Sequence, residues 1–290
     1  MLYLTITTLI WAFSFGLIGN TLQGIEPMQI ADMRLLLASL AFLPFLKLGQ
    51  TNHQEKLQLL GLGAIQYGVM YTCYMLAFRF LPSHLVALFS VLTPLYVVLI
   101  YDLSKRKFTP WYLVAALLSV LGAAIIKADT FATDDIWLGF ALMQIANLSF
   151  AFGQVYYRNW KHARPEVDNS AIFGFLYLGA LLFTTLVTVV IFNQIPVPLS
   201  ASPKQWAVIV YLGVIASGIG FFCWNKGATK TTVGALSAFN NAVVPLAMFA
   251  SLFVFGEADE RSTEDLMRLA AGAITIAVAL VIGTRVTANR

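Results

Sequence analysis

Long apolar runs alternate with short polar connections along the whole of this 290-residue chain. A helix that crosses a bilayer needs about 20 predominantly apolar residues, and ten runs qualify. None shows the period of two that marks the strands of a membrane β-barrel. The pattern therefore predicts an all-α polytopic membrane protein with ten transmembrane helices, at residues 2–20, 28–48, 57–79, 83–102, 109–127, 136–157, 170–192, 204–225, 231–255 and 266–284.

The composition agrees with a surface that faces a lipid bilayer. Hydrophobic residues make up 59% of the chain and charged residues 11%, against roughly 25% charge in a soluble domain. The net charge of +4 does not indicate a nucleic acid partner, because the basic residues stand singly or in short clusters beside the apolar runs. That arrangement is typical of membrane topology signals.

The distribution of Lys and Arg predicts the orientation. With a cytoplasmic N-terminus, twelve of these residues fall on the inner side and five on the outer side, and Arg34 lies within a span. Basic residues collect on the cytoplasmic side of membrane proteins. We therefore expect both termini to be cytoplasmic, in a protein of the cell inner (plasma) membrane.

The few cysteines and histidines do not indicate a cofactor. Cys73 and Cys223 both fall in apolar segments, and His53, His84 and His162 belong to three separate segments. Metal sites in proteins need closely spaced ligands of these types. We therefore predict neither a metal nor another cofactor.

Two halves of the chain resemble each other. The stretch "GAIQYGVMYTCY" (63–74) aligns with "GVIASGIGFFCW" (213–224) at an offset of 150, and Pro94 aligns with Pro245 at an offset of 151. Near the start of each half, "FSFG" matches "FAFG". The first five spans therefore correspond to the last five.

This repeat predicts two units, residues 1–129 and 130–290, that enter the membrane in opposite directions because five is an odd number. Inverted repeats with a site at their interface are a recurring architecture of transporters.

The stretches "LIWAFSFGLIGN", "EPMQIADMRLLLASLAFLPFL" and "VVPLAMFASLFVFGEAD" resemble the EamA family of the drug/metabolite transporter superfamily. The most specific elements are Trp11 and the segments 27–34 and 245–257. The first half departs from the pattern, because "YDLSKRK" lacks the Gly256–Glu257 pair that ends the corresponding span of the second half. The resemblance implies a ten-helix exporter with a central cavity, in a family whose members move amino acids, other metabolites or drugs.

The sixth predicted span carries a polar face. Gln144, Asn147, Gln154 and Arg158 recur at helical spacing. Such a stripe avoids lipid, so it faces either a hydrated cavity or neighbouring helices, to which it would bond. We favour the cavity, and on this basis assign Gln144 and Asn147 to substrate binding.

Aromatic residues form a second candidate surface. Tyr67, Tyr71 and Tyr74 share one face of the third span, with Gln66 beside them. Aromatic faces also serve simply to pack helices together. A wall of rings, hydroxyls and amides is nevertheless well suited to an amphipathic organic solute, and we assign all four residues to the site.

Trp11 and Ser14 share a face of the first span, and Trp11 lies too far inside to belong to an interfacial belt. The family resemblance places this span beside the central cavity. In the second half, Phe221 and Trp224 are the counterparts of Tyr71 and Tyr74. We expect Trp11, Ser14 and Trp224 to bind substrate.

Pro94 and Pro245 interrupt two apolar segments four residues after Ser90 and Asn241. A proline removes the hydrogen bond to the carbonyl four residues back, so each segment should bend where a polar partner is near. The bends serve either to shape the bundle or as hinges. Ser90, Asn241 and the neighbouring Asn240 join the substrate-binding candidates.

Arg34 is the basic residue inside a predicted span. It captures an anionic substrate, or it pairs with Asp32, Glu26 or the acidic 256–265 loop, or it reaches the lipid headgroups. We favour gating or charge pairing. His84 is assigned to the same group, and no predicted span has a carboxylate near its centre.

These features predict a transporter, with a small organic solute and the lipid bilayer as partners, as a monomer or weak homodimer. Export of amino acids or related metabolites by alternating access is the leading hypothesis. The alternatives are a multidrug or toxic-compound efflux permease and a membrane-embedded enzyme. The enzyme is disfavoured, since the chain lacks HExxH, GxSxG and a Gly-rich phosphate loop.

Overall fold

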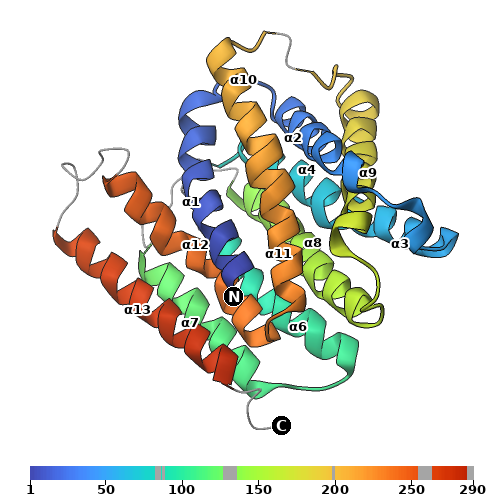
Figure 1. Cartoon of the computed structure of the whole chain (residues 1–290). Coiled ribbons are helices and arrows are strands. Elements are labelled where there is room, and N and C mark those ends of the chain that lie inside the picture. The colour runs from blue at the N-terminus through green and yellow to red at the C-terminus, as the bar shows by residue number, and fades with distance from the viewer. Residues whose placement is uncertain (82–85, 87–88, 127–135, 198–199, 254–262, 286–290) are drawn as a thin grey trace.

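The computed structural model describes residues 1–81, 86, 89–126, 136–197, 200–253 and 263–285. Every one of the ten predicted segments contains helix, and the described residues form no strand. The helices (Figure 1) are α1 (Leu2–Thr21), α2 (Pro27–Phe42), α3 (His53–Gly63), α4 (Met70–Ala77), α6 (Thr93–Lys105), α7 (Pro110–Ile126), α8 (Ile136–His162), α9 (Asn169–Leu186), α10 (Pro203–Val210), α11 (Gly220–Thr229), α12 (Val233–Phe253) and α13 (Thr263–Arg285).

Three helices continue through a π-helical segment. Ala64–Val69 (η3) joins α3 to α4, Tyr211–Ile219 (η6) joins α10 to α11, and Val187–Ile191 (η5) extends α9. Five stretches are long and apolar enough to cross a bilayer: Pro27–Phe45, His53–Ala77, Ile136–His162, Asn169–Ile191 and Pro203–Thr229. Four further described helices are apolar but shorter. The chain is thus an all-helical membrane protein.

The helices form two groups with α1 and α8 between them (Figure 1). In one group, α7 and α13 pack along each other and against α12. In the other, α2 and α9 pack together and against the α3–α4 and α10–α11 helices. α1 contacts both α12 and α11, and α8 contacts α4, α11 and α6, which itself packs against α12 and α7. These helices therefore link the two groups.

Glycines bring α3 and α9 into backbone contact. A methyl group on Gly63 would lie 1.9 Å from the carbonyl oxygen of Leu176, and one on Gly179 would lie 1.9 Å from that of Leu60. Any larger side chain would force the helices apart. Small residues at such positions are a common way for membrane helices to approach closely.

The described part of the fourth predicted span is irregular just before Pro94. Phe89 is helical, the chain makes a 3-10 turn at Ser90–Leu92, and α6 begins at Thr93 with Pro94 in its first turn. Proline is well tolerated there, because the amide that it lacks would have no partner inside the helix. Pro245 lies inside α12, and a hinge role for either proline stays a prediction.

Side chains satisfy the carbonyls that this break releases. The Phe89 carbonyl accepts a hydrogen bond from Asn147 Nδ2 at 2.7 Å, and the Val91 carbonyl accepts one from Asn241 Nδ2 at 3.0 Å. The Ser90 carbonyl accepts one from Thr93 Oγ1 at 2.7 Å. Irregular backbone is stable at membrane depth only with such partners, so α8 and α12 hold the broken segment in place.

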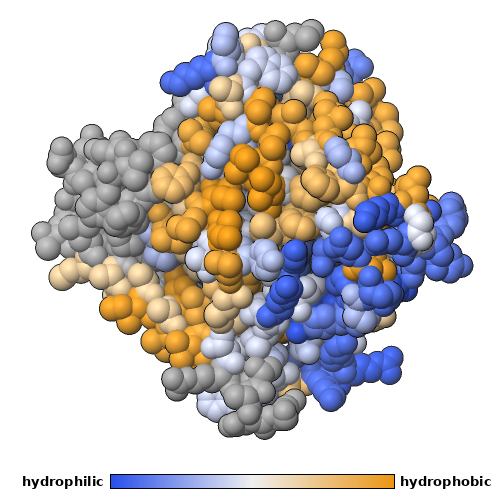
Figure 2. Space-filling model, viewed as in Figure 1, coloured by the Kyte–Doolittle hydropathy of each residue, from blue (hydrophilic) through white to orange (hydrophobic). Residues whose placement is uncertain are grey.

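The outer surface is largely apolar. Figure 2 shows hydrophobic side chains over α1 and the α10–α11 helix, where Leu9, Phe13, Val210 and Ile219 are exposed. Hydrophilic side chains gather at the end of the molecule where α3 begins and where α6 and α8 end. This division is expected of a surface that faces lipid in its middle and water at its end.

Candidate functional site

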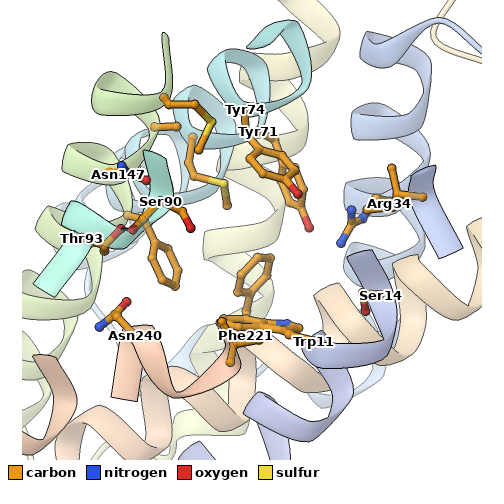
Figure 3. Close-up of a pocket in the computed structure, with 16 residues that line it drawn as sticks. Trp11, Ser14, Arg34, Tyr71, Tyr74, Ser90, Thr93, Asn147, Phe221 and Asn240 are labelled. Atoms are coloured by element: carbon orange, nitrogen blue, oxygen red, sulfur yellow. Dashed lines mark hydrogen bonds between the residues drawn. The ribbon is translucent and has the colours of Figure 1, made fainter. Parts of the chain in front are cut away.

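A cavity of about 150 Å³ lies where α1, α2, α4, α6, α8, α11 and α12 meet the 3-10 turn at Ser90–Leu92 (Figure 3). Eight residues that the sequence singled out line it: Trp11, Ser14, Arg34, Tyr71, Tyr74, Ser90, Asn147 and Asn240. They come from both halves of the chain. The cavity therefore brings together side chains that are up to 229 positions apart, since 240 − 11 = 229.

Aromatic rings form one wall of the cavity. The Trp11 indole stacks on Trp224, with ring centroids 5.0 Å apart, and meets the Phe221 ring edge-on at 5.2 Å. Its Nε1 donates a hydrogen bond of 2.9 Å to the Ala216 carbonyl of η6. These contacts fix the indole, so this wall offers a rigid apolar surface to a solute.

Arg34 lies on another side of the cavity, 4% exposed. Its Nε donates to Ser217 Oγ at 3.1 Å, and its guanidinium carbon lies 4.7 Å from the centre of the Tyr71 ring. Ser217 Oγ donates its own hydrogen to the Leu212 carbonyl at 2.8 Å. The Tyr71 hydroxyl, 2.9 Å from Ser217 Oγ, must therefore be the donor in that contact.

The expected pairing of Arg34 with a nearby acid is wrong for the two described candidates. Glu26 forms an ion pair with Arg79 at 2.6 Å. Asp32 accepts hydrogen bonds from Thr188 and other threonine hydroxyls of the α9 helix. The 256–265 loop, the third candidate, begins with residues outside the described ranges. No carboxylate among the residues that the structure describes lies within ion-pair distance of Arg34.

Neutral polar groups lie across the cavity from Arg34 (Figure 3). Asn147 and Thr93 belong to this side. Asn147 Nδ2 donates to the Phe89 carbonyl at 2.7 Å and to Gln144 Oε1 at 3.4 Å, and Thr93 Oγ1 donates its one hydrogen to the Ser90 carbonyl. The oxygens Oδ1 of Asn147 and Oγ1 of Thr93 are then the groups that they present as acceptors.

Gln66 and Trp224, both predicted to bind substrate, do not line the cavity and instead bond to neighbouring helices. Gln66 and Asn225 exchange hydrogen bonds of 2.9 and 3.1 Å through their amides, and both are 0% exposed. Trp224 donates from Nε1 to Gln154 Oε1 at 3.0 Å. Gln154 is in turn paired with the Asn240 amide. A polar residue finds such a partner when a facing helix supplies one, and then it does not face solvent.

The remaining predictions are placed as follows. Tyr67 is 0% exposed and stacks on Phe221 at 4.5 Å, so it supports the aromatic wall from behind. Gln144 accepts from the Tyr96 hydroxyl at 3.0 Å and lies beside Asn147, outside the lining. Asn241 holds the broken segment, as described above. His84 lies outside the described residues.

Several lining residues are not among those predicted from the sequence. Phe221 is marked in the sequence only as the counterpart of Tyr71. Met143 and Phe150 lie four residues before and three residues after Asn147 on α8, so helical spacing places them on the same face. A search restricted to polar side chains passes over them.

Apolar helices around a central cavity lined from both halves of a chain are the architecture of a small-solute membrane transporter. The family model of the EamA-like transporter family matches residues 1–128 and 137–283, so the chain belongs to this family. The resemblance noted in the sequence is thereby confirmed. Family and relatives point to a transporter and away from an enzyme.

Two bacterial relatives have names that include a substrate. The chain is 40% identical to the "Biotin transporter" of Salmonella typhimurium over 257 residues, 88% of this chain and 85% of that protein. It is 40% identical to the "Probable biotin transporter" of Pseudomonas aeruginosa, with 97% and 96% covered. A solved crystal structure shares the fold at a TM-score of 0.78 and 18% identity, covering 100% of this chain and 98% of the other.

Proposed function

We propose that this protein transports biotin, or a close structural relative of biotin, across the bacterial inner membrane through the central cavity. The observation that carries the proposal is the charge of that cavity: among its described lining residues, Arg34 is the one ionised side chain. Biotin is a monocarboxylate with an otherwise uncharged ring system. The names of the relatives, at 40% identity over most of the chain, support the same substrate.

An amino acid fits this cavity less well than the sequence analysis supposed. A zwitterion carries an ammonium group that needs a carboxylate or several carbonyls when it leaves water, and none of the described lining residues is Asp or Glu. We therefore favour a monoanion over a zwitterion. Export, the direction that the family resemblance implied, stays a prediction.

We further propose ten spans in two inverted halves, 1–129 and 130–290, with both termini cytoplasmic. Two of the three π-helical segments, η3 and η6, support the repeat. At the offset of 150, η3 at Ala64–Val69 corresponds to residues 214–219, because 64 + 150 = 214 and 69 + 150 = 219, and η6 covers Tyr211–Ile219. Such segments occur often at functional sites. The protein is proposed to act as a monomer or weak homodimer.

In this topology the cavity is closed toward the cytoplasm. Beneath it lie the Gln66–Asn225 and Gln154–Trp224 bonds, and then Arg158, which donates to the Ala228 carbonyl at 3.0 Å. On the opposite side a second hollow shares Ile18 with the cavity and reaches the α1–α2 connection. The arrangement is that of an outward-facing state in an alternating-access cycle.

The proposal is tested with purified protein in liposomes and radiolabelled biotin. We expect time-dependent accumulation that unlabelled biotin competes away and that a panel of amino acids does not. Protein-free liposomes are the control, and preloaded liposomes and cells measure the direction. No accumulation above the control, or equal competition by amino acids or by a panel of unrelated drugs, would refute the proposed substrate.

A further inference from the structure

The geometry points to a fixed orientation of the substrate. This inference rests on the proposed function. We propose that the carboxylate of the transported acid binds the Arg34 guanidinium and that the opposite end presents N–H donors to Asn147 and Thr93. The apolar middle then lies along Trp11 and Phe221. The site thereby selects a monocarboxylate that carries a neutral cyclic urea or a similar N–H donor at its far end.

The N–H groups of the Arg34 guanidinium are suited to bind the substrate carboxylate. A guanidinium has five N–H groups, and Nε–H bonds Ser217. The side chain is only 4% exposed, and its guanidinium also interacts with Tyr71 but pairs with no carboxylate among the described residues. Burying a charge without a partner is costly. The Ser217 bond and the Tyr71 ring hold the guanidinium plane, so its terminal nitrogens are positioned for a bidentate bond to a carboxylate.

The side of the cavity opposite Arg34 presents hydrogen-bond acceptors to the other end of the substrate. Asn147 uses Nδ2 on the Phe89 carbonyl, and Thr93 uses its hydroxyl hydrogen on the Ser90 carbonyl. Asn240 is engaged with Gln154 in both directions. Oxygen acceptors therefore predominate here, and they match N–H donors of a neutral group. Asp and Glu are absent from the described lining, so nothing there would hold a cation.

The cationic Arg34 and the oxygen acceptors lie on opposite sides of the cavity. Figure 3 shows Arg34 on one side, Asn147 and Thr93 on the other, and the rings of Trp11 and Phe221 between them. A short substrate would reach one side only. An elongated acid with an apolar centre contacts both at once, which is the shape of a carboxylate on an alkyl chain joined to a fused ring.

Arg34→Gln tests the carboxylate contact, with Arg79→Gln as the matched control, because Arg79 is outside the cavity lining and pairs with Glu26. Uptake of biotin and of uncharged biotinamide is measured for each variant in liposomes. Loss of a charged bidentate contact should raise the KM for biotin on the order of 10- to 100-fold. Arg34→Gln should lose the preference for biotin over biotinamide, and Arg79→Gln should keep it. An unchanged KM and preference in Arg34→Gln would overturn the assignment.

Arg34→Lys tests the same carboxylate contact if Arg34→Gln does not fold. It keeps the charge but lacks the planar fork, so the KM for biotin should rise while the preference for the acid remains. An unchanged KM would overturn the bidentate contact. Wild-type liposomes that take up no biotin would instead refute the proposed function itself, so the two failures are distinct.

Substrate analogues test the far side. Desthiobiotin keeps the cyclic urea and should be taken up with a KM close to that of biotin. Methylation of one urea nitrogen removes a donor and should raise the KM on the order of 10-fold. If the methylated compound is taken up like biotin, the assignment of Asn147 and Thr93 fails, whatever the result for Arg34.

Discussion

Trp11→Ala should abolish biotin transport and destabilise the protein by up to about 3 kcal/mol, because truncation of a fully buried aromatic side chain costs about 3–5 kcal/mol and this indole is half-buried. The indole stacks on Trp224, meets Phe221 and donates to the Ala216 carbonyl of η6. Removing it leaves that carbonyl without this donor and removes one apolar wall of the cavity. Thermal unfolding in detergent and uptake in liposomes measure the two effects.

The control for this variant is Trp137→Ala, because Trp137 lies near the start of α8 and is 76% exposed. It should retain both stability and transport. Trp11→Phe keeps a ring in the stack but not the hydrogen bond, and should fall between wild type and Trp11→Ala. If Trp11→Ala transports biotin as wild type does, Trp11 is not part of the transport site.

Gln66→Leu alone should destabilise the protein by about 1–3 kcal/mol, because it leaves the buried Asn225 amide without its partner. Adding Asn225→Leu should restore most of the loss, since two apolar side chains leave no buried polar group unpaired. The double variant should nevertheless transport biotin more slowly. Opening toward the cytoplasm must then expose leucines in place of amides that water can solvate.

A double-mutant cycle measures this coupling. Thermal unfolding is recorded for the wild type, both single variants and the double variant, and kcat for uptake is recorded for the stable ones. Additive destabilisation would show that the two amides do not interact. A double variant with wild-type kcat would show that the pair is not part of the cytoplasmic closure.

The helical segments were predictable, because apolar runs of the required length leave few alternatives in a chain with so little charge. The break before Pro94 was not. A proline four residues after a small polar residue is compatible with a kink or with a new helix start. The outcome depends on Asn147 and Asn241, which reach the released carbonyls from helices distant in sequence.

The sequence predicted some of the cavity residues and misplaced others. Arg34 and Asn147 line the cavity, whereas Gln66 lies on a similar polar surface but is paired with Asn225. Whether a polar residue faces water or a neighbour is decided by the helix opposite, and one sequence read along its length does not reveal that helix. The internal repeat is the sequence feature that reveals most about the opposite helix, because it aligns Phe221 with Tyr71 and both residues line the cavity.

The most direct test of a substrate pathway through the cavity is thiol labelling of a cysteine placed in it. Ser14 lines the cavity, and its hydroxyl donates to the Ile10 carbonyl of its own helix. Ser14→Cys replaces one small polar side chain with another and is a mild change. It is made together with Cys73→Ser and Cys223→Ser, which remove the two native thiols. Gln66→Cys in the same background is the buried control.

We expect a membrane-impermeant thiol reagent, added from the outer side, to label the cysteine at position 14 and not that at position 66. Saturating biotin should slow the labelling. Absence of labelling at position 14, or labelling that biotin leaves unchanged, would contradict a substrate pathway through this cavity.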